Sequence, residues 1–132
     1  MCLLIISDYV DALEPKQVQD VSLALHKCIA RARMGGRPVG FVQRRRGAGF
    51  EALNVRIGRY EPVFAASDMA ATLPPALIDF VVARMPSHIE LAGVAQAQTF
   101  ARYESVFRGA GYHVRIDHAA TLPILIPAHK SA

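Results

Sequence analysis

The chain has 132 residues and 52% hydrophobic residues, enough for a single α/β domain over 1–132 with a buried core. No window reaches the ~18 uninterrupted apolar residues of a membrane span, and the first residues lack the basic segment of a signal peptide. The two cysteines, Cys2 and Cys28, form neither a disulfide framework nor a metal-ligand spacing. These features predict a cytoplasmic protein with reduced thiols, no membrane contact and no resident metal.

The net charge of +4 comes mainly from arginine, which accounts for most of the 15 basic residues. A guanidinium binds phosphates and carboxylates bidentately, so the composition is compatible with nucleic-acid contact. A coding sequence of high GC content enriches arginine as well, and composition therefore does not require that function.

The first elements are a buried strand over 2–7, which ends at Asp8, and a long helix. The helix is predicted to open near Asp11 or Glu14, with Pro15 in its first turn, and to end at Gly35 and Gly36. Between these limits apolar residues recur at spacings of three and four, the pattern of one buried helical face. Its members are Val18, Val21, Leu25, Cys28 and Ala32.

A second strand is expected over 37–43, followed by a run of arginines and a glycine-rich turn. The next segment, 50–58, fits two patterns: alternation favours a strand and a hairpin, whereas Phe50, Leu53 and Ile57 also share one helical face. A short apolar run over 63–66 predicts a further strand.

The second half of the chain repeats the alternation of helix and strand. Thr72 is predicted to cap a helix that runs to Met85, and a strand follows at 89–91. Another helix buries an aromatic face and is closed by glycines, before a strand over 112–116. The apolar tail 122–127 contains two prolines, which restrict it to an edge strand or a packed extended segment.

This order of elements predicts a three-layer α/β fold, with a mostly parallel sheet and helices on both faces. Ligands of such sheets bind at the carboxyl ends of the strands. Asp8, the segment 43–46, Gly93 and Asp117 are expected near those ends.

Three segments resemble the NYN/PIN-like nuclease domains: Leu4-Ile5-Ile6-Ser7-Asp8, Leu77-Ile78-Asp79-Phe80-Val81-Val82, and the glycine turn and strand from Gly109 to Ile116. The resemblance implies a PIN/NYN-like fold with an acidic site that includes Asp8 and Asp79. Where that family carries paired acids, this chain has Val94 and Gln96.

The loss of these acids leaves few ligands for a hard cation such as Mg²⁺. The resemblance therefore implies a degenerate pseudo-nuclease that binds nucleic acid, as RNA or single strands, without cutting it and without a cofactor. Asp8 and Asp79 would be catalytic only if activity remains. Outside the resemblance, a helix cap explains Asp8 equally well, and an exposed or arginine-paired position explains Asp79.

The predicted nucleic-acid contacts are Arg44, Arg45 and Arg46, with Arg37 in support. Three guanidiniums beside a glycine-rich turn are able to follow a phosphate backbone, and their binding would be salt-dependent. A solvated turn explains the same run without any ligand.

Two other functions remain open. One is a weak ribonuclease in which Asp8 and Asp79 bind Mg²⁺ or Mn²⁺. The other is a protein-interaction module without a nucleic-acid role, which binds a partner or forms a homodimer through the apolar tail 122–127.

Overall fold

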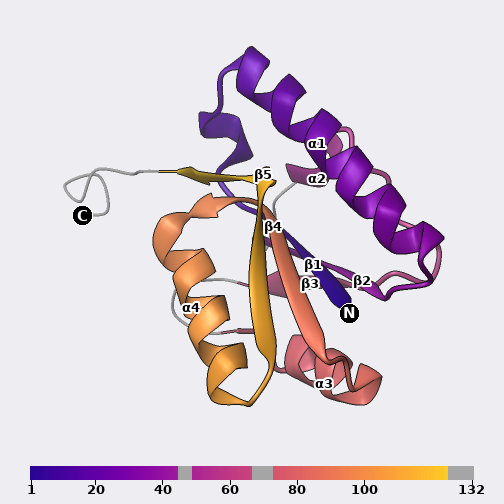
Figure 1. Cartoon of the computed structure of the whole chain (residues 1–132). Coiled ribbons are helices and arrows are strands. Elements are labelled where there is room, and N and C mark those ends of the chain that lie inside the picture. Colours follow the sequence, from indigo (N-terminus) through magenta and orange to yellow (C-terminus); the bar gives the residue numbers. More distant parts are fainter. Residues whose placement is uncertain (45–48, 67–72, 125–132) are drawn as a thin grey trace.

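The computed structural model describes residues 1–44, 49–66 and 73–124 (Figure 1). Strands and helices alternate along the chain, and one short 3₁₀ helix, η1, follows the first strand. In order they are β1 (Cys2–Ser7), η1 (Val10–Ala12), α1 (Pro15–Met34), β2 (Val39–Arg44), α2 (Gly49–Ala52), β3 (Val63–Ala66), α3 (Pro75–Arg84), β4 (His88–Gln96), α4 (Ala97–Gly109) and β5 (His113–Ile124). Within these ranges no helix is long and apolar enough to cross a membrane.

The five strands form one sheet in the order β3-β2-β1-β4-β5, and every neighbouring pair is parallel. Helices α1 and α2 cover one face, and α3 and α4 cover the other (Figure 1). The predicted three-layer α/β architecture is therefore confirmed.

Strand β1 is the centre of both cores, because all six of its residues are buried. Leu3 and Ile5 pack on the α1 side, whereas Leu4 and Ile6 pack against α3 and α4. Full burial of each such side chain stabilises the fold by roughly 1.5–3 kcal/mol. This is why β1 appears in the sequence as a continuous apolar run rather than an alternating one.

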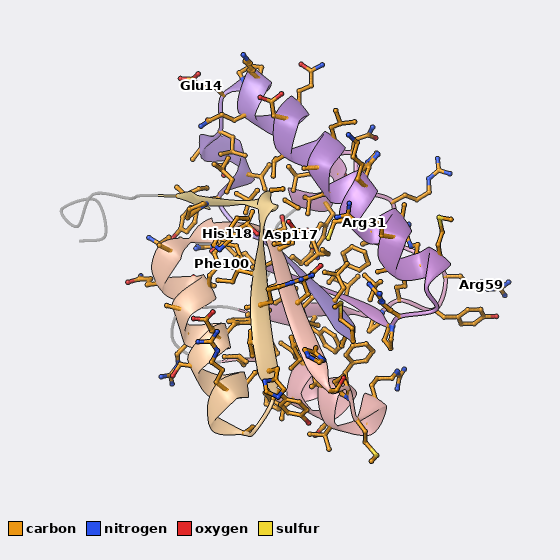
Figure 2. All side chains as sticks on the ribbon, in the orientation of Figure 1. Glu14, Arg31, Arg59, Phe100, Asp117 and His118 are labelled. Atoms are coloured by element: carbon orange, nitrogen blue, oxygen red, sulfur yellow. The ribbon has the colours of Figure 1, made fainter. Side chains whose placement is uncertain are left out.

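Helix α1 begins as predicted, with Glu14 as its N-cap and Pro15 in the first turn. The Gln17 side chain accepts a hydrogen bond from the Glu14 backbone N–H at 2.9 Å, which is half of a capping box. Figure 2 shows Glu14 at this end of α1 and Arg31 near the other. At that second end Arg33 Nε donates to Glu61 at 2.9 Å, and this ion pair ties α1 to the loop before β3.

The hairpin predicted over 50–58 is absent, and the helical alternative holds for only one turn. Residues Gly49–Ala52 form α2, and an irregular loop follows. The packing explains this outcome: Phe50 meets Phe41 edge-to-face at 5.1 Å between ring centroids, and Leu53 is fully buried. Arg59 points away from the core, at the end of the molecule where α1 ends (Figure 2).

Strands β4 and β5 are longer than predicted. Strand β4 runs on through Gly93 and Val94 to Gln96, and β5 continues to Ile124 after a register shift between the pairs Leu91–Ile116 and Gly93–Thr121. Because β5 is the edge strand, Pro123 fits there without breaking a ladder between two neighbours. The rest of the tail, 125–132, lies outside the described residues.

The close approach of β4 to β1 depends on Gly93. Its φ is +119°, and a Cβ there would lie 1.9 Å from the Ile6 carbonyl oxygen. We expect Gly93→Ala to destabilise the protein by at least about 3 kcal/mol, because backbone strain and a clash with backbone add together. Thermal unfolding followed by circular dichroism measures this effect.

The matched control is Gly109→Ala, at the last residue of α4, where a Cβ meets nothing within 4 Å. This change should be neutral or stabilising by up to about 1 kcal/mol. Equal melting temperatures for the two variants would contradict the assignment of Gly93.

The Arg33–Glu61 pair predicts a pH dependence. Hydrogen bonds from Arg33 lower the pKa of Glu61 below its ordinary value of 4.5. The contribution of this ion pair to the free energy of unfolding is therefore complete above pH 4.5, and it is lost as the pH falls through the lower pKa of Glu61 in the folded state. Urea unfolding at a series of acidic pH values should show a shallower loss of stability for Glu61→Gln than for the wild type. Glu51→Gln, at an exposed glutamate of α2, should follow the wild type.

Candidate functional site

A buried carboxylate marks the carboxyl edge of the sheet. Asp8 follows β1 directly and is only 3% exposed. Its backbone N–H donates to the Val94 carbonyl at 2.8 Å, which fixes it beside the end of β4. The strand order reverses its direction between β1 and β4, and such a switch point is where parallel α/β sheets bind ligands.

Arg44 pairs with this carboxylate from the neighbouring strand. The parallel register sets Ser7 beside Gln43, so the next residues, Asp8 and Arg44, meet at the ends of β1 and β2. Arg44 Nε donates to Oδ1 at 2.6 Å and Nη2 donates to Oδ2 at 3.1 Å, a bidentate pair. Hydrogen bonding to Asp8 raises the pKa of Arg44 above its usual range. The guanidinium also lies over the Tyr9 ring, 4.4 Å from its centroid.

Two buried hydroxyls belong to α4, the helix that follows the end of β4. Thr99 and Tyr103 lie one turn apart on the helix, and both are fully buried. Neither hydroxyl oxygen has a hydrogen-bond partner among the described residues. Burial raises the pKa of Tyr103, and the negative charge of Asp8 raises it further. The Tyr103 hydroxyl is therefore close enough to Asp8 for the two groups to interact electrostatically.

The first turn of α4 adds backbone donors. The first N–H groups of any helix have no intrahelical acceptor, and Thr99 is the third residue of this one. Carboxylate, hydroxyl and free N–H groups are the elements from which acyl-transfer sites are built. Ser7 Oγ also lacks a described partner, but it faces Gly49 on the opposite side of the sheet.

The two cysteines lie away from this edge. Cys2 begins β1 at the amino end of the sheet, where burial raises the pKa of its thiol to about 11. Cys28 is in the middle of α1, beside Glu90. A cysteine nucleophile is therefore not available next to Asp8.

The structure separates the residues that the sequence assigned to one site. Asp8 is where it was predicted, at a strand end, but Asp79 lies on the exposed face of α3. That helix packs near the amino halves of β2 and β3, as the 5.6 Å contact between the Phe80 and Phe64 rings shows. Within the described part of the chain, the two aspartates therefore do not share one acidic site.

The predicted arginine patch is also divided. Arg44 is engaged by Asp8 and Tyr9. Arg37 precedes β2 at the opposite edge of the sheet, where its Nη1 donates to the Met1 sulfur at 3.7 Å. Arg45 and Arg46 lie outside the described residues.

Sequence reasoning missed the hydroxyl pair of α4. Tyr103 was assigned only to an apolar helical face, where it does lie, and Thr99 was not considered. The available signal was their spacing of four residues, which places both side chains on one face of the helix that starts at the carboxyl edge of the sheet.

Comparison with known proteins gives fold similarity alone. No family model matches the chain, and no curated protein matches its sequence. Among solved structures, N-carbamoylsarcosine amidase from Thermoplasma acidophilum has a TM-score of 0.76 at 14% identity, over 98% of this chain and 88% of that one. An isochorismatase from Pseudomonas putida KT2440 has a TM-score of 0.74 at 16% identity, over 98% and 78%.

A third similar structure is the nicotinamidase of Staphylococcus aureus, with a TM-score of 0.69 at 13% identity, over 91% of this chain and 80% of that one. The fold is therefore the three-layer architecture of isochorismatase-like hydrolases. The similarity to PIN/NYN nucleases is wrong at the level of family. It rested on an order of elements and short apolar motifs that many parallel α/β domains share.

The functions derived from that resemblance are corrected with it. A ribonuclease from Caenorhabditis elegans is also similar, but at a lower TM-score of 0.65 and over 63% of that chain. The prediction of nucleic-acid binding is therefore wrong, because the higher-scoring similar structures are an amidase and an isochorismatase, and neither the metal-dependent ribonuclease nor the protein-interaction module fits better.

The bidentate geometry predicts a measurable coupling between Asp8 and Arg44. In a double-mutant cycle of Asp8→Asn and Arg44→Gln, unfolding free energies should give a coupling of about 1–3 kcal/mol, because the carboxylate is buried. The exposed pair Glu104–Arg108, 3.4 Å apart on α4, is the matched control and should give only about 0.3–0.5 kcal/mol. Equal couplings would show that Asp8 is solvated.

Proposed function

We propose that this protein is a hydrolase of the isochorismatase and amidase type, which cleaves a small carboxamide at the corner between β1, β4 and α4. The observation that carries the proposal is the buried Asp8 carboxylate at the strand-order switch, whose charge acts on the buried Tyr103 hydroxyl of α4. The fold similarity to an amidase and a nicotinamidase supports carboxamides as the substrate class.

In the proposed reaction the Thr99 hydroxyl is the nucleophile. Its Oγ1 forms a bond to the amide carbon while Asp8 accepts the hydroxyl proton, and the C–N bond then breaks as the amine leaves with that proton. Water hydrolyses the resulting ester and returns the proton to Thr99. The free N–H groups of the first α4 turn bind the oxyanion that forms in both steps.

Arg44 positions the base rather than reacting. Its two hydrogen bonds hold the carboxylate plane, and each oxygen keeps a lone pair for a further proton donor.

The test is release of ammonia from small amides, with nicotinamide and N-carbamoylsarcosine as the first probes. For an amide that the wild type cleaves, Asp8→Asn should lower kcat about 10²–10⁴-fold. Thr99→Val should abolish turnover, whereas Thr99→Ser keeps a hydroxyl and should retain part of it.

Asp11→Asn, an exposed aspartate in η1, is the matched control and should leave kcat unchanged. Turnover that survives in Thr99→Val would assign attack to water instead of this hydroxyl. Full activity in Asp8→Asn, or no release from any carboxamide of a broad panel by the wild type, would overturn the proposal.

A further inference from the structure

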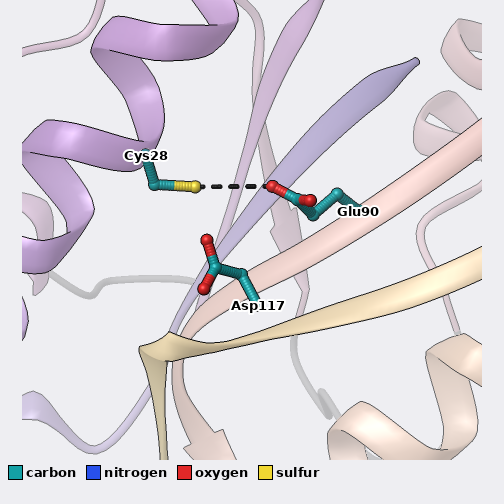
Figure 3. A group of neighbouring side chains, drawn as sticks. All are labelled: Cys28, Glu90 and Asp117. Atoms are coloured by element: carbon teal, nitrogen blue, oxygen red, sulfur yellow. Dashed lines mark hydrogen bonds between the residues drawn. The ribbon is translucent and has the colours of Figure 1, made fainter.

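A second cluster of reactive side chains lies on the α1 side of the sheet. Cys28 of α1, Glu90 of β4 and Asp117 of β5 converge there (Figure 3), and one ligand atom from each lies within 4.8 Å of the others. The Cys28 thiol donates to Glu90 Oε1 at 3.6 Å. Cys28 and Glu90 are buried, and Asp117 is partly exposed.

The fold places each of these groups independently of the Asp8 corner. Cys28 belongs to the buried stripe of α1. Glu90 is the third residue of β4, four residues before the Val94 carbonyl that binds Asp8. Asp117 stands at the register shift of β5, where its Oδ1 accepts the Ala119 N–H at 3.1 Å.

The charge of this cluster is poorly balanced in its interior. Arg115 pairs with Glu90 and Arg31 lies 3.6 Å from Asp117, but their side chains are 72% and 68% exposed. Figure 2 shows Arg31 to the right of Asp117. Such cations lie largely in water and compensate buried acids only in part. Burial, together with the two acids, also raises the pKa of the Cys28 thiol to about 12.

We infer that Cys28, Glu90 and Asp117 form a binding site for a divalent cation of the zinc type. Zinc–sulfur bonds of about 2.3 Å and zinc–oxygen bonds of about 2.0 Å, at a tetrahedral angle, separate the two ligand atoms by about 3.5 Å. The distance between Cys28 Sγ and Glu90 Oε1 already has this value. The thiolate selects zinc or cobalt over magnesium and calcium, which prefer oxygen ligands throughout.

Three protein ligands leave the fourth position of a tetrahedral site for water or a small ligand. Asp117 also lines a surface pocket of about 250 Å³ between α1 and β5, together with Lys27 and Arg31. This pocket exposes the Asp117 side of the cluster to solvent. On binding, the metal displaces the thiol proton to solvent, and the exposed guanidiniums turn outward.

The test titrates the reduced, metal-free chain with Co²⁺, the spectroscopic substitute for Zn²⁺. Binding should produce thiolate-to-cobalt charge-transfer absorption that saturates at one equivalent and is displaced by Zn²⁺. Calorimetry in buffers of different ionisation enthalpy should report release of about one proton per metal.

Variants distinguish this site from any other. Cys28→Ser should abolish the charge-transfer band, whereas Cys2→Ser, at the other buried thiol, should keep it. Asp117→Asn should weaken Co²⁺ binding at least about 10-fold, and Glu104→Gln, at a carboxylate of α4, should not.

The opposite results would overturn the inference. They are a titration without a charge-transfer band, a band that persists in Cys28→Ser, or equal Co²⁺ affinity in wild type and Asp117→Asn. Each of these readouts is independent of amide hydrolysis.

Discussion

The burial of β1 on both faces and along both edges is the constraint on which the rest of the structure depends. Every residue of this strand is buried, and its backbone pairs with β2 on one side and β4 on the other. Among the five described strands, β1 is the one at the centre of the sheet, and helices cover both of its faces. Because parallel strands need crossover connections, the helices must cover the two faces, and the three layers follow.

The same strand decides where chemistry is possible. The pairing of its last residue, Ser7, brings Asp8 to the ends of both neighbours, so the Asp8 carboxylate accepts from a guanidinium of β2 and the Asp8 backbone N–H donates to a carbonyl of β4. Helix α4 starts from the end of β4, so its first turn, which includes Thr99, lies at the same edge of the sheet, and Tyr103 follows one turn later. A buried acid is tolerated there because its charge is paired and hydrogen-bonded.

The alternation of side chains along a strand separates the two proposed sites. Asp8 continues the series of Leu4 and Ile6 and faces the layer of α3 and α4, whereas Glu90 faces Cys28 of α1. A ligand at one site is therefore screened from the other by the sheet itself. The proposed amide hydrolysis and the proposed metal binding accordingly belong to different faces of the sheet.

The sequence by itself determined the elements whose signals are local. The continuous apolar run of β1 and the glycine end of α4 each depend on residues within a few positions and were predicted, as was a start of α1 near Asp11 or Glu14. It also placed Asp8 at a strand end.

Only the tertiary structure decided the partners, because they come from segments far apart in the chain: Arg44 on Asp8, and Glu90 and Asp117 around Cys28. The tertiary structure also decided the conformation of 50–58, because the buried contacts of Phe50 and Leu53 outweigh the alternating pattern. A short motif cannot distinguish one parallel α/β fold from another, since the register and order of strands are set by packing across the whole sheet.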